Sequence, residues 1–150
     1  QIGKKKTEKA FDYANKFAIL GPLSGIIVGL GLYFIAPHIV SIMNIKPESI
    51  YDTQKILAVI ALYQPIKTFN VIMIVGILRS GGDTLYSFIL EIGSVWLIGV
   101  PMAFLGAVVF KVPIYYVVAM ASVEEIFKFI IGAPRVISEK WLNNEVENME

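Results

Sequence analysis

The sequence contains no cysteine, so this chain offers no disulfide bond, thiolate nucleophile or cysteine metal ligand. Histidine occurs once, as His38, and the chain therefore lacks the clusters of nitrogen and sulfur ligands that zinc sites require. No nucleophile stands next to a residue that could act as its base. We therefore expect no enzyme activity, no metal ion and no organic cofactor.

Charged residues are also missing from a long stretch near the start of the chain. Positions 17–45 contain no Asp, Glu, Lys or Arg, and as a helix they would reach about 43 Å, against roughly 30 Å for the hydrocarbon core of a bilayer. Hydrophobic residues make up 56% of the chain, and segments such as 26–40 are apolar on every side. The composition predicts an integral membrane protein in contact with lipid. A net charge of +1 gives no indication of nucleic-acid binding.

The hydropathy pattern predicts an all-α helical bundle with four membrane-spanning helices. Their expected ranges are 17–43, 56–78, 85–110 and 113–131. They would form a single unit over residues 1–142, followed by a polar cytoplasmic tail at 143–150. Because the chain starts without methionine and without a secretory signal, we expect it to be part of a longer protein.

The distribution of lysines predicts the orientation of the bundle. Several lysines precede the first helix, at positions 4, 5, 6, 9 and 16. In the next loop, by contrast, Lys46 and Lys55 are offset by Glu48 and Asp52. The positive-inside rule therefore places the start in the cytoplasm, and an even number of spans returns the end to the same side. We expect a multi-pass protein of the cell membrane.

Three glycines in the first helix recur every four residues, at Gly21, Gly25 and Gly29. This spacing leaves one helix face without side chains and lets a second helix approach closely. We interpret the face as a packing seam. The alternative is that Pro22, together with the glycines, makes this helix bend during a transport cycle.

Polar residues gather in the middle of the second helix, around Pro65. Gln64, Lys67 and Thr68 share an arc of about 100°, with Asn70 at its edge. A lysine at this depth costs roughly 2.5–3.5 kcal/mol, so Lys67 requires a partner or a water-filled cavity. It either fastens helices together or lies on a transport pathway.

The third helix contains a candidate partner, Glu91, within a polar stripe. Lys67 and Glu91 would differ in depth by about 6 Å, which a lysine side chain can bridge. We therefore predict an ion pair between them. A carboxylate at this depth is also a candidate for binding protons or cationic substrates.

The turn between these two helices contains Arg79, Gly81, Gly82 and Asp83. Its glycines permit a tight reversal, and Asp83 is placed to cap the next helix. It lacks the lysine and the spacing of a phosphate-binding loop, so a structural hairpin is the preferred interpretation.

The fourth helix carries Glu124 and Glu125, four and three residues before Lys128. These spacings favour pairing along a single helix surface. The alternative is a gate at the cytoplasmic side, closed by one glutamate against a basic residue elsewhere. Lys128 itself is expected near the membrane edge.

The series of motifs resembles the C-terminal part of the MATE (multidrug and toxic compound extrusion) family of efflux transporters. It comprises Ile2-Gly3, Glu8-Lys9-Ala10, Gln64-Pro65, Asn70, Leu78-Arg79-Ser80-Gly81-Gly82-Asp83-Thr84, Trp96, Val100-Pro101, Glu124-Glu125, Lys128, Arg135, Ser138, Lys140 and Trp141. The turn motif between two spanning helices is the most specific of these.

The resemblance implies a twelve-helix transporter of two lobes, of which this chain would form most of the second. It implies export of organic cations and other amphipathic drugs by alternating access, in exchange for protons or sodium ions. The partners would be the rest of the same transporter, the drugs and membrane lipid. Gln64, Lys67, Asn70 and Glu91 would face the central cavity, and the chain alone would be inactive. Some members carry an acidic residue in the second of these helices, where this chain has Lys67.

Two alternatives remain at this stage. A lipid-linked oligosaccharide flippase of the same superfamily would need several cations for a large anionic head group, and the helices contain few. A small four-helix channel or assembly subunit is the other alternative.

Overall fold

The computed structural model describes residues 7–43, 45–138 and 141. Within these residues the chain forms helices and short connections, with no strand. Several predictions fall outside the described residues. These are the cytoplasmic placement of Lys4, Lys5 and Lys6, the first motif at Ile2-Gly3, the contribution of Lys140, and the polar tail at 143–150.

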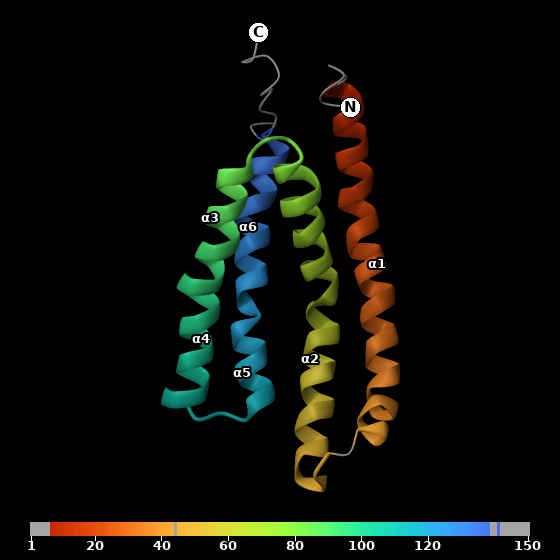
Figure 1. Ribbon diagram of the computed structural model, residues 1–150, viewed down its shortest axis with the longest axis vertical. Coiled ribbons are helices and arrows are strands. Elements are labelled where there is room, and N and C mark those ends of the chain that lie inside the picture. Colours follow the sequence, from red (N-terminus) through yellow and green to blue (C-terminus); the bar gives the residue numbers. More distant parts are fainter. Residues whose placement is uncertain (1–6, 44, 139–140, 142–150) are drawn as a thin grey trace.

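The helices join into four antiparallel rods (Figure 1). The first rod is α1 (Thr7–Ile42), and the second is α2 (Pro47–Val71) continued by the wider π-helical turn η2 (Ile72–Arg79). The third rod consists of α3 (Thr84–Ser94), η3 (Val95–Gly99), α4 (Val100–Phe104) and η4 (Leu105–Val109). The fourth consists of α5 (Ile114–Ala121) and α6 (Val123–Ile137). The predicted all-α fold is confirmed.

Three of the rods are long and apolar enough to cross a membrane. They are Lys16–Ile42, Pro47–Arg79 and Thr84–Val109, and most of their surface is not buried inside the bundle. Large apolar side chains such as Ile27, Leu62 and Leu97 are more than 70% exposed, as expected for a surface that meets lipid or further helices.

The fourth rod differs from the single helix predicted at 113–131, because it is broken at Ser122. The Ser122 hydroxyl donates a hydrogen bond of 2.8 Å to the Val118 carbonyl, which its own backbone N–H also reaches at 3.0 Å. A serine side chain that competes for a helix carbonyl in this way weakens the regular helix. The helix axis restarts at Val123 and extends beyond the predicted end, to Ile137.

The first two rods also begin earlier than predicted. α1 starts at Thr7 instead of residue 17, and α2 starts at Pro47 instead of residue 56. Proline is favoured in the first turn of a helix, where its missing N–H leaves no hydrogen bond unmade, and Glu48 complements the positive helix end. Polar helical turns therefore extend both rods beyond their apolar segments.

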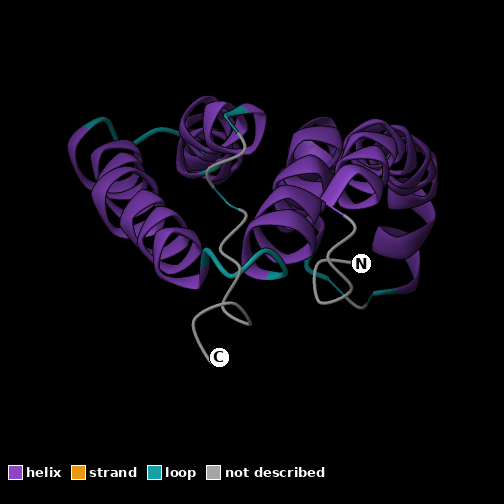
Figure 2. Cartoon of the chain, turned by 90° about the horizontal axis from the view of Figure 1, so that it is seen from above, coloured by secondary structure: helices purple, strands orange, loops and turns teal. Residues whose placement is uncertain are grey.

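α1 lies at one edge of the bundle, against α2 and η2 (Figure 2). A Cβ atom added at Gly25 would lie 2.7 Å from the Pro65 Cα, and one added at Gly29 would lie 2.6 Å from the Ala61 carbonyl oxygen. The two backbones thus meet where α1 has no side chains. This is the packing seam predicted from the glycine spacing.

The main apolar core lies at the end of the bundle where the second rod turns into the third. It consists of buried side chains from η2, α3 and the segment after α6: Met73, Ile74, Ile77, Leu78, Leu90 and Trp141. Trp141 is 2% exposed and packs against Gly81, where any side chain would collide with its ring. The core therefore fixes the turn relative to the last helix.

Candidate functional site

A cavity of about 400 Å³ lies among the second, third and fourth rods. Its lining is mostly apolar, with Lys67, Glu124 and Glu125 as the charged members. The other lining residues are Ile60, Tyr63, Val95, Gly99, Val100, Ala103, Val118, Ala121 and Ser122. The broken fourth rod thus places the start of α6 beside a cavity within the spanning part of the bundle.

Lys67 lines this cavity from α2. Ile60, Tyr63 and Lys67 recur at helical spacing, so this face of α2 looks toward the other two rods. Lys67 forms no ion pair with any residue in the described part of the chain. From the sequence, Lys67 required either a partner or a cavity. Among the described residues, the structure shows the cavity.

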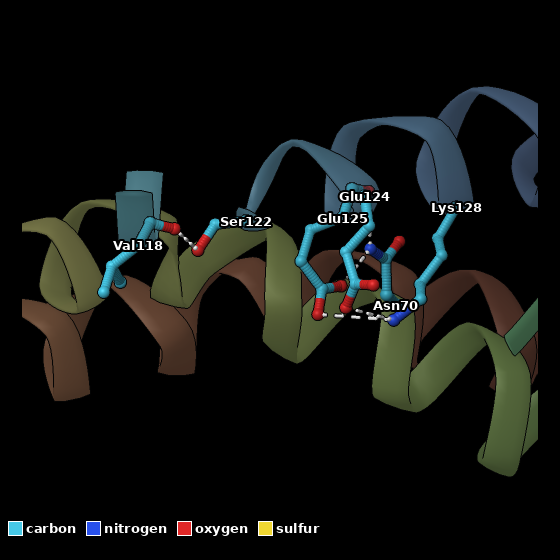
Figure 3. Close-up of polar contacts among 6 residues, drawn as sticks. All are labelled: Asn70, Val118, Ser122, Glu124, Glu125 and Lys128. Carbon is cyan, nitrogen blue, oxygen red and sulfur yellow. Dashed lines mark hydrogen bonds and ion pairs between the residues drawn. The ribbon is translucent and has the colours of Figure 1, made fainter. Parts of the chain in front are cut away.

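A buried polar cluster adjoins the cavity, between α2 and α6 (Figure 3). The Asn70 amide Nδ2 donates to the Glu125 backbone oxygen at 2.7 Å and to its carboxylate Oε2 at 2.8 Å. Lys128 Nζ lies 3.0 Å from Glu124 Oε1 and 3.6 Å from Glu125 Oε1. Asn70, Glu125 and Lys128 are each less than 10% exposed. The contacts on α6 are the local pairs that the residue spacing favours.

Lys128 was expected near the membrane edge, and its depth in a bilayer stays a prediction. Its side chain is 7% exposed and lies in contact with Glu124 and Glu125. α6 continues beyond the predicted end to Ile137, so Lys128 does not lie at the end of the helix.

The cluster gathers two carboxylates with a single lysine in direct contact. Glu124 and Glu125 lie in the first turn of α6, where the helix dipole favours negative charge. Glu124 also fits against Gly99, since a Cβ there would lie 2.5 Å from its Oε2. With Lys67 across the cavity, the positive and negative charges of the site balance in number. The Asn70 carbonyl oxygen Oδ1 is buried and has no hydrogen-bond partner among the residues that the structure describes.

Glu91 is not the partner of Lys67. Its Oε2 pairs with Arg79 Nη2, from the end of η2, and both side chains are about half-exposed. Glu91 is absent from the cavity lining. The predicted Lys67–Glu91 pair is therefore not present in this structure: the long guanidinium arm of Arg79 reaches down to Glu91, while Lys67 turns toward α6.

The polar residues of α2 point in two directions. Gln64 and Thr68 lie against α1: a Cβ at Gly25 would meet the Gln64 carbonyl and the Thr68 hydroxyl, which donates to that same carbonyl at 2.9 Å. Lys67 and Asn70 face the cavity and α6. The predicted arc thus divides between a helix contact and the site.

The turn at residues 79–83 is held by backbone hydrogen bonds and by α6. The Asp83 N–H donates to the Leu78 carbonyl at 3.0 Å, and Gly82 adopts a left-handed φ of 92° that favours glycine. Asp83 occupies the cap position of α3 but makes no capping hydrogen bond, so that detail of the prediction is wrong. Its Oδ2 instead accepts a hydrogen bond of 2.7 Å from Arg135 Nε, which raises the pKa of Arg135 above its ordinary value.

Sequence reasoning did not identify Ser122 and Gly99 as part of the site. Serine between a helix and two glutamates is a signal for a new helix start, which could have revealed the break. Gly99 lies in an apolar segment, and only the three-dimensional contact with Glu124 gives it a role. Within the described residues, no group of His, Asp and Glu has the arrangement to hold a metal ion.

Comparison with known proteins assigns the family. The family model described as MatE matches residues 1–105, which is more than half of the chain. The chain belongs to the MatE family. This is a family of membrane transporters, and the match includes Lys67, the turn at 79–83 and the third rod as far as Leu105. No curated protein and no solved structure matches the chain.

Proposed function

We propose that this MatE chain is part of a secondary active multidrug antiporter of the cell membrane, with both ends of the bundle on the cytoplasmic side. The transporter would export organic cations by alternating access, in exchange for protons or sodium ions. The observation that supports this is the cluster of Asn70, Glu124, Glu125 and Lys128 beside a cavity within an apolar bundle.

A pair of carboxylates, the buried Glu125 and the partly buried Glu124, gives a physical basis for exchange. Burying a charge in the membrane is costly, so such groups are usually paired or serve a pathway. Lys128 contacts both glutamates, yet one lysine neutralises one negative charge. Lys67 balances the second charge in number but makes no ion pair with it, so a proton, a sodium ion or the cationic group of a drug can bind that carboxylate, one at a time. Competition among these ligands is the requirement of antiport.

The site is less suited to a lipid-linked oligosaccharide flippase. A large anionic head group would need several uncommitted cations. Lys128 is committed to Glu124 and Glu125, which leaves Lys67 as the lysine that faces the cavity without an ion pair among the described residues. Membership of a transporter family likewise favours transport over a role as an assembly subunit.

The pathway proposed from the sequence consists of Gln64, Lys67, Asn70 and Glu91. We retain Lys67 and Asn70 as its central members because both lie at the cavity or its adjoining cluster. Glu124, Glu125 and Lys128 join them as a candidate gate or exchange site. Gln64 contacts α1, and Glu91 pairs with Arg79, so we place both residues at the border of the pathway.

Ethidium efflux tests this proposal, in membrane vesicles from cells that express the full-length protein. A proton gradient and a sodium gradient are imposed in separate experiments. We expect one of them to drive efflux, and Glu125→Gln to reduce the rate by about ten-fold, the equivalent of 1.4 kcal/mol. Glu91→Gln tests the position at the border of the pathway. We expect it to reduce the rate of ethidium efflux less than Glu125→Gln does.

Glu48→Gln is the matched control, because Glu48 is exposed in the first turn of α2. It should transport like the unaltered protein. Absence of ethidium efflux under both gradients, from correctly inserted protein, would overturn the antiporter proposal. Equal losses of efflux rate in Glu48→Gln and Glu125→Gln would show that the cluster has no role in exchange.

A further inference from the structure

α1 and α2 lie side by side (Figure 1), and a groove runs along their contact. It consists of two adjoining hollows of about 480 Å³ and about 300 Å³, which share Tyr33 and Ala58. The larger hollow extends from there to Ile26 and Pro65, and the smaller one extends the other way to Lys55. None of these residues lines the cavity among the second, third and fourth rods.

We infer that this groove binds one anionic phospholipid, with its phosphate group at Lys55 and an acyl chain along the larger hollow toward Pro65. The lipid belongs to the leaflet on the side of the connection near Lys46. This inference goes beyond the proposed antiport, because it concerns a surface outside the transport cavity and does not depend on the transported substrate.

The length of the groove matches the depth of one leaflet. Lys55 and Pro65 are separated by ten positions on α2 (65 − 55), which corresponds to about 15 Å along a helix. The hydrocarbon core of a bilayer is roughly 30 Å thick, so one leaflet contributes roughly 15 Å. With Lys55 at the level of the head groups, the far end of the groove lies near the middle of the bilayer. The groove therefore covers the depth of one acyl chain.

Tyrosines mark the level of Lys55 as a membrane–water interface. Lys55 Nζ lies 5.4 Å from the centroid of the Tyr51 ring. Tyr51 packs edge-to-face against Tyr115 of α5, with 6.2 Å between the ring centroids, and Tyr115 contacts Tyr116 at 4.6 Å. Tyrosine is enriched where a membrane meets water, because its ring is apolar and its hydroxyl is polar. A lysine at this level extends its ammonium group toward the phosphates.

The charge of Lys55 is available to a phosphate group. Lys55 is exposed, lines the groove beside Gln54, and makes no ion pair with any described residue. Asp52, one helical turn away, does not line the groove. A phosphate here gains a hydrogen bond to a charged group without displacing an ion pair. A zwitterionic head group also brings a positive charge that Lys55 repels, so the site favours an anionic lipid.

The larger hollow is shaped for an apolar chain. Gly29 and Ala61 form its floor, since a Cβ added at Gly29 would lie 2.6 Å from the Ala61 carbonyl oxygen. Its sides are Ile26, Leu30 and Leu62, which are 44%, 53% and 77% exposed. A chain in such a groove makes van der Waals contacts on more than one side, whereas a chain on a convex helix surface makes them on one. The shape therefore holds an acyl chain more closely than the surrounding surface does.

Photo-crosslinking tests the inference with purified full-length protein in phosphatidylcholine vesicles. One sample contains a minor fraction of phosphatidylglycerol with a diazirine at the end of one acyl chain, and a parallel sample contains phosphatidylcholine with the same modified chain. Mass spectrometry of peptides locates and quantifies the adducts. We expect adducts at Ile26, Leu62 or Pro65, with a yield about five-fold higher from phosphatidylglycerol, the equivalent of about 1 kcal/mol for one lysine near an anionic lipid.

Four variants make the result specific. Lys55→Gln should remove the preference for phosphatidylglycerol, and Lys55→Arg should keep it. Lys46→Gln alters an exposed lysine at the same end of the bundle but outside the groove, and should leave the ratio of the two yields unchanged. Ala58→Leu narrows the groove where the two hollows meet, and should reduce the groove adducts of both lipids while the adducts elsewhere on the protein remain.

Three outcomes would overturn the inference. Adducts elsewhere on the protein but none in the groove would show that another segment of the transporter covers it. Equal yields from the two lipids in the unaltered protein would refute recognition of an anionic head group. An unchanged ratio in Lys55→Gln would refute the role of Lys55. Ethidium efflux is measured separately, so failure of the antiporter proposal leaves the lipid result in place, and the reverse also holds.

Discussion

The Asp83 carboxylate connects two parts of the chain that are far apart in sequence. It is 6% exposed and accepts a hydrogen bond from Arg135, whose guanidinium also lies 4.8 Å over the Tyr86 ring. Tyr86 in turn donates to the Ile131 carbonyl at 3.0 Å. These contacts tie the start of α3 to the last turns of α6 and so hold the end of the bundle together.

Replacing Asp83 with asparagine should therefore destabilise the protein. Asp83→Asn removes the charge that Arg135 requires and keeps the size of the side chain. We expect the free energy of unfolding to fall by about 1–3 kcal/mol, which is typical for loss of a hydrogen bond to a charged group. Unfolding of the purified full-length protein in a detergent titration measures this.

Asp52→Asn is the matched control for this substitution. Asp52 is partly exposed in α2 and forms no ion pair with the described residues. Its substitution should change the free energy of unfolding by less than about 0.5 kcal/mol. If Asp52→Asn lowers the free energy of unfolding as much as Asp83→Asn does, the contact of Asp83 with Arg135 does not contribute specifically to stability.

At single residues, the sequence predicted which charges enter the spans more reliably than which partners they have. Lys67 and Glu91 were paired by depth along two helices, but depth does not fix the direction in which a long side chain turns. Arg79 lies within reach of Glu91 and forms an ion pair with it. The pairs on α6 were predictable because both members share one helix, where spacing alone sets the contact.

At the scale of elements, the α1–α2 contact depends on the absence of side chains. A Cβ at Gly25 would approach the backbone of α2 at Pro65 and the Gln64 carbonyl, and neither can move without displacing the helix. Gly31 lies on the same helix with open space around it. The two glycines thus differ in packing while sharing the same helix.

This difference predicts opposite effects of one substitution. Gly25→Ala should lower the free energy of unfolding by about 1–3 kcal/mol, because the new methyl group forces the helices apart. Gly31→Ala should leave it unchanged or raise it by up to about 1 kcal/mol, since alanine favours helix over glycine. The same detergent titration compares the free energies of unfolding of the two variants. Equal changes in both would contradict the packing seam.

The sequence predicted this seam but missed the break in the fourth rod. The glycine spacing is a local periodic signal. It extends over about two turns of α1, where the glycines lie against the second rod. Ser122 breaks the helix through a hydrogen bond to Val118 that many helices tolerate without interruption. The serine before two glutamates is a local signal for a new helix start, but whether the helix ends there also depends on the tertiary contacts of Glu124 and Glu125, which the local signal does not contain.

At the scale of the whole molecule, the antiparallel rods divide the connections between two ends. The turn at residues 79–83 lies at the end where α1 begins and α6 finishes, and the connections near Lys46 and Lys111 lie at the opposite end (Figure 1). The same division followed from the sequence, because counting apolar segments requires no knowledge of how they pack. The distribution of lysines then predicts that Lys46 and Lys111 face the outside.

Cysteine labelling in intact cells tests this orientation. Single cysteines replace Lys46, Lys111 or Thr84, all three of which are exposed in the structure, in full-length protein freed of other cysteines. A membrane-impermeant maleimide should label Lys46→Cys and Lys111→Cys. Thr84→Cys should remain unlabelled, because the membrane separates it from the reagent.

Permeabilised cells provide the control, since all three cysteines should then react. Labelling of Thr84→Cys alone in intact cells would invert the orientation, and the proposed site would then exchange ligands in the opposite sense. Labelling of Lys46→Cys without Lys111→Cys would contradict the antiparallel arrangement in the membrane, because a chain in which the second and third rods both cross has the two positions on one side. The pair of outer positions therefore tests the topology, and Thr84 tests its direction.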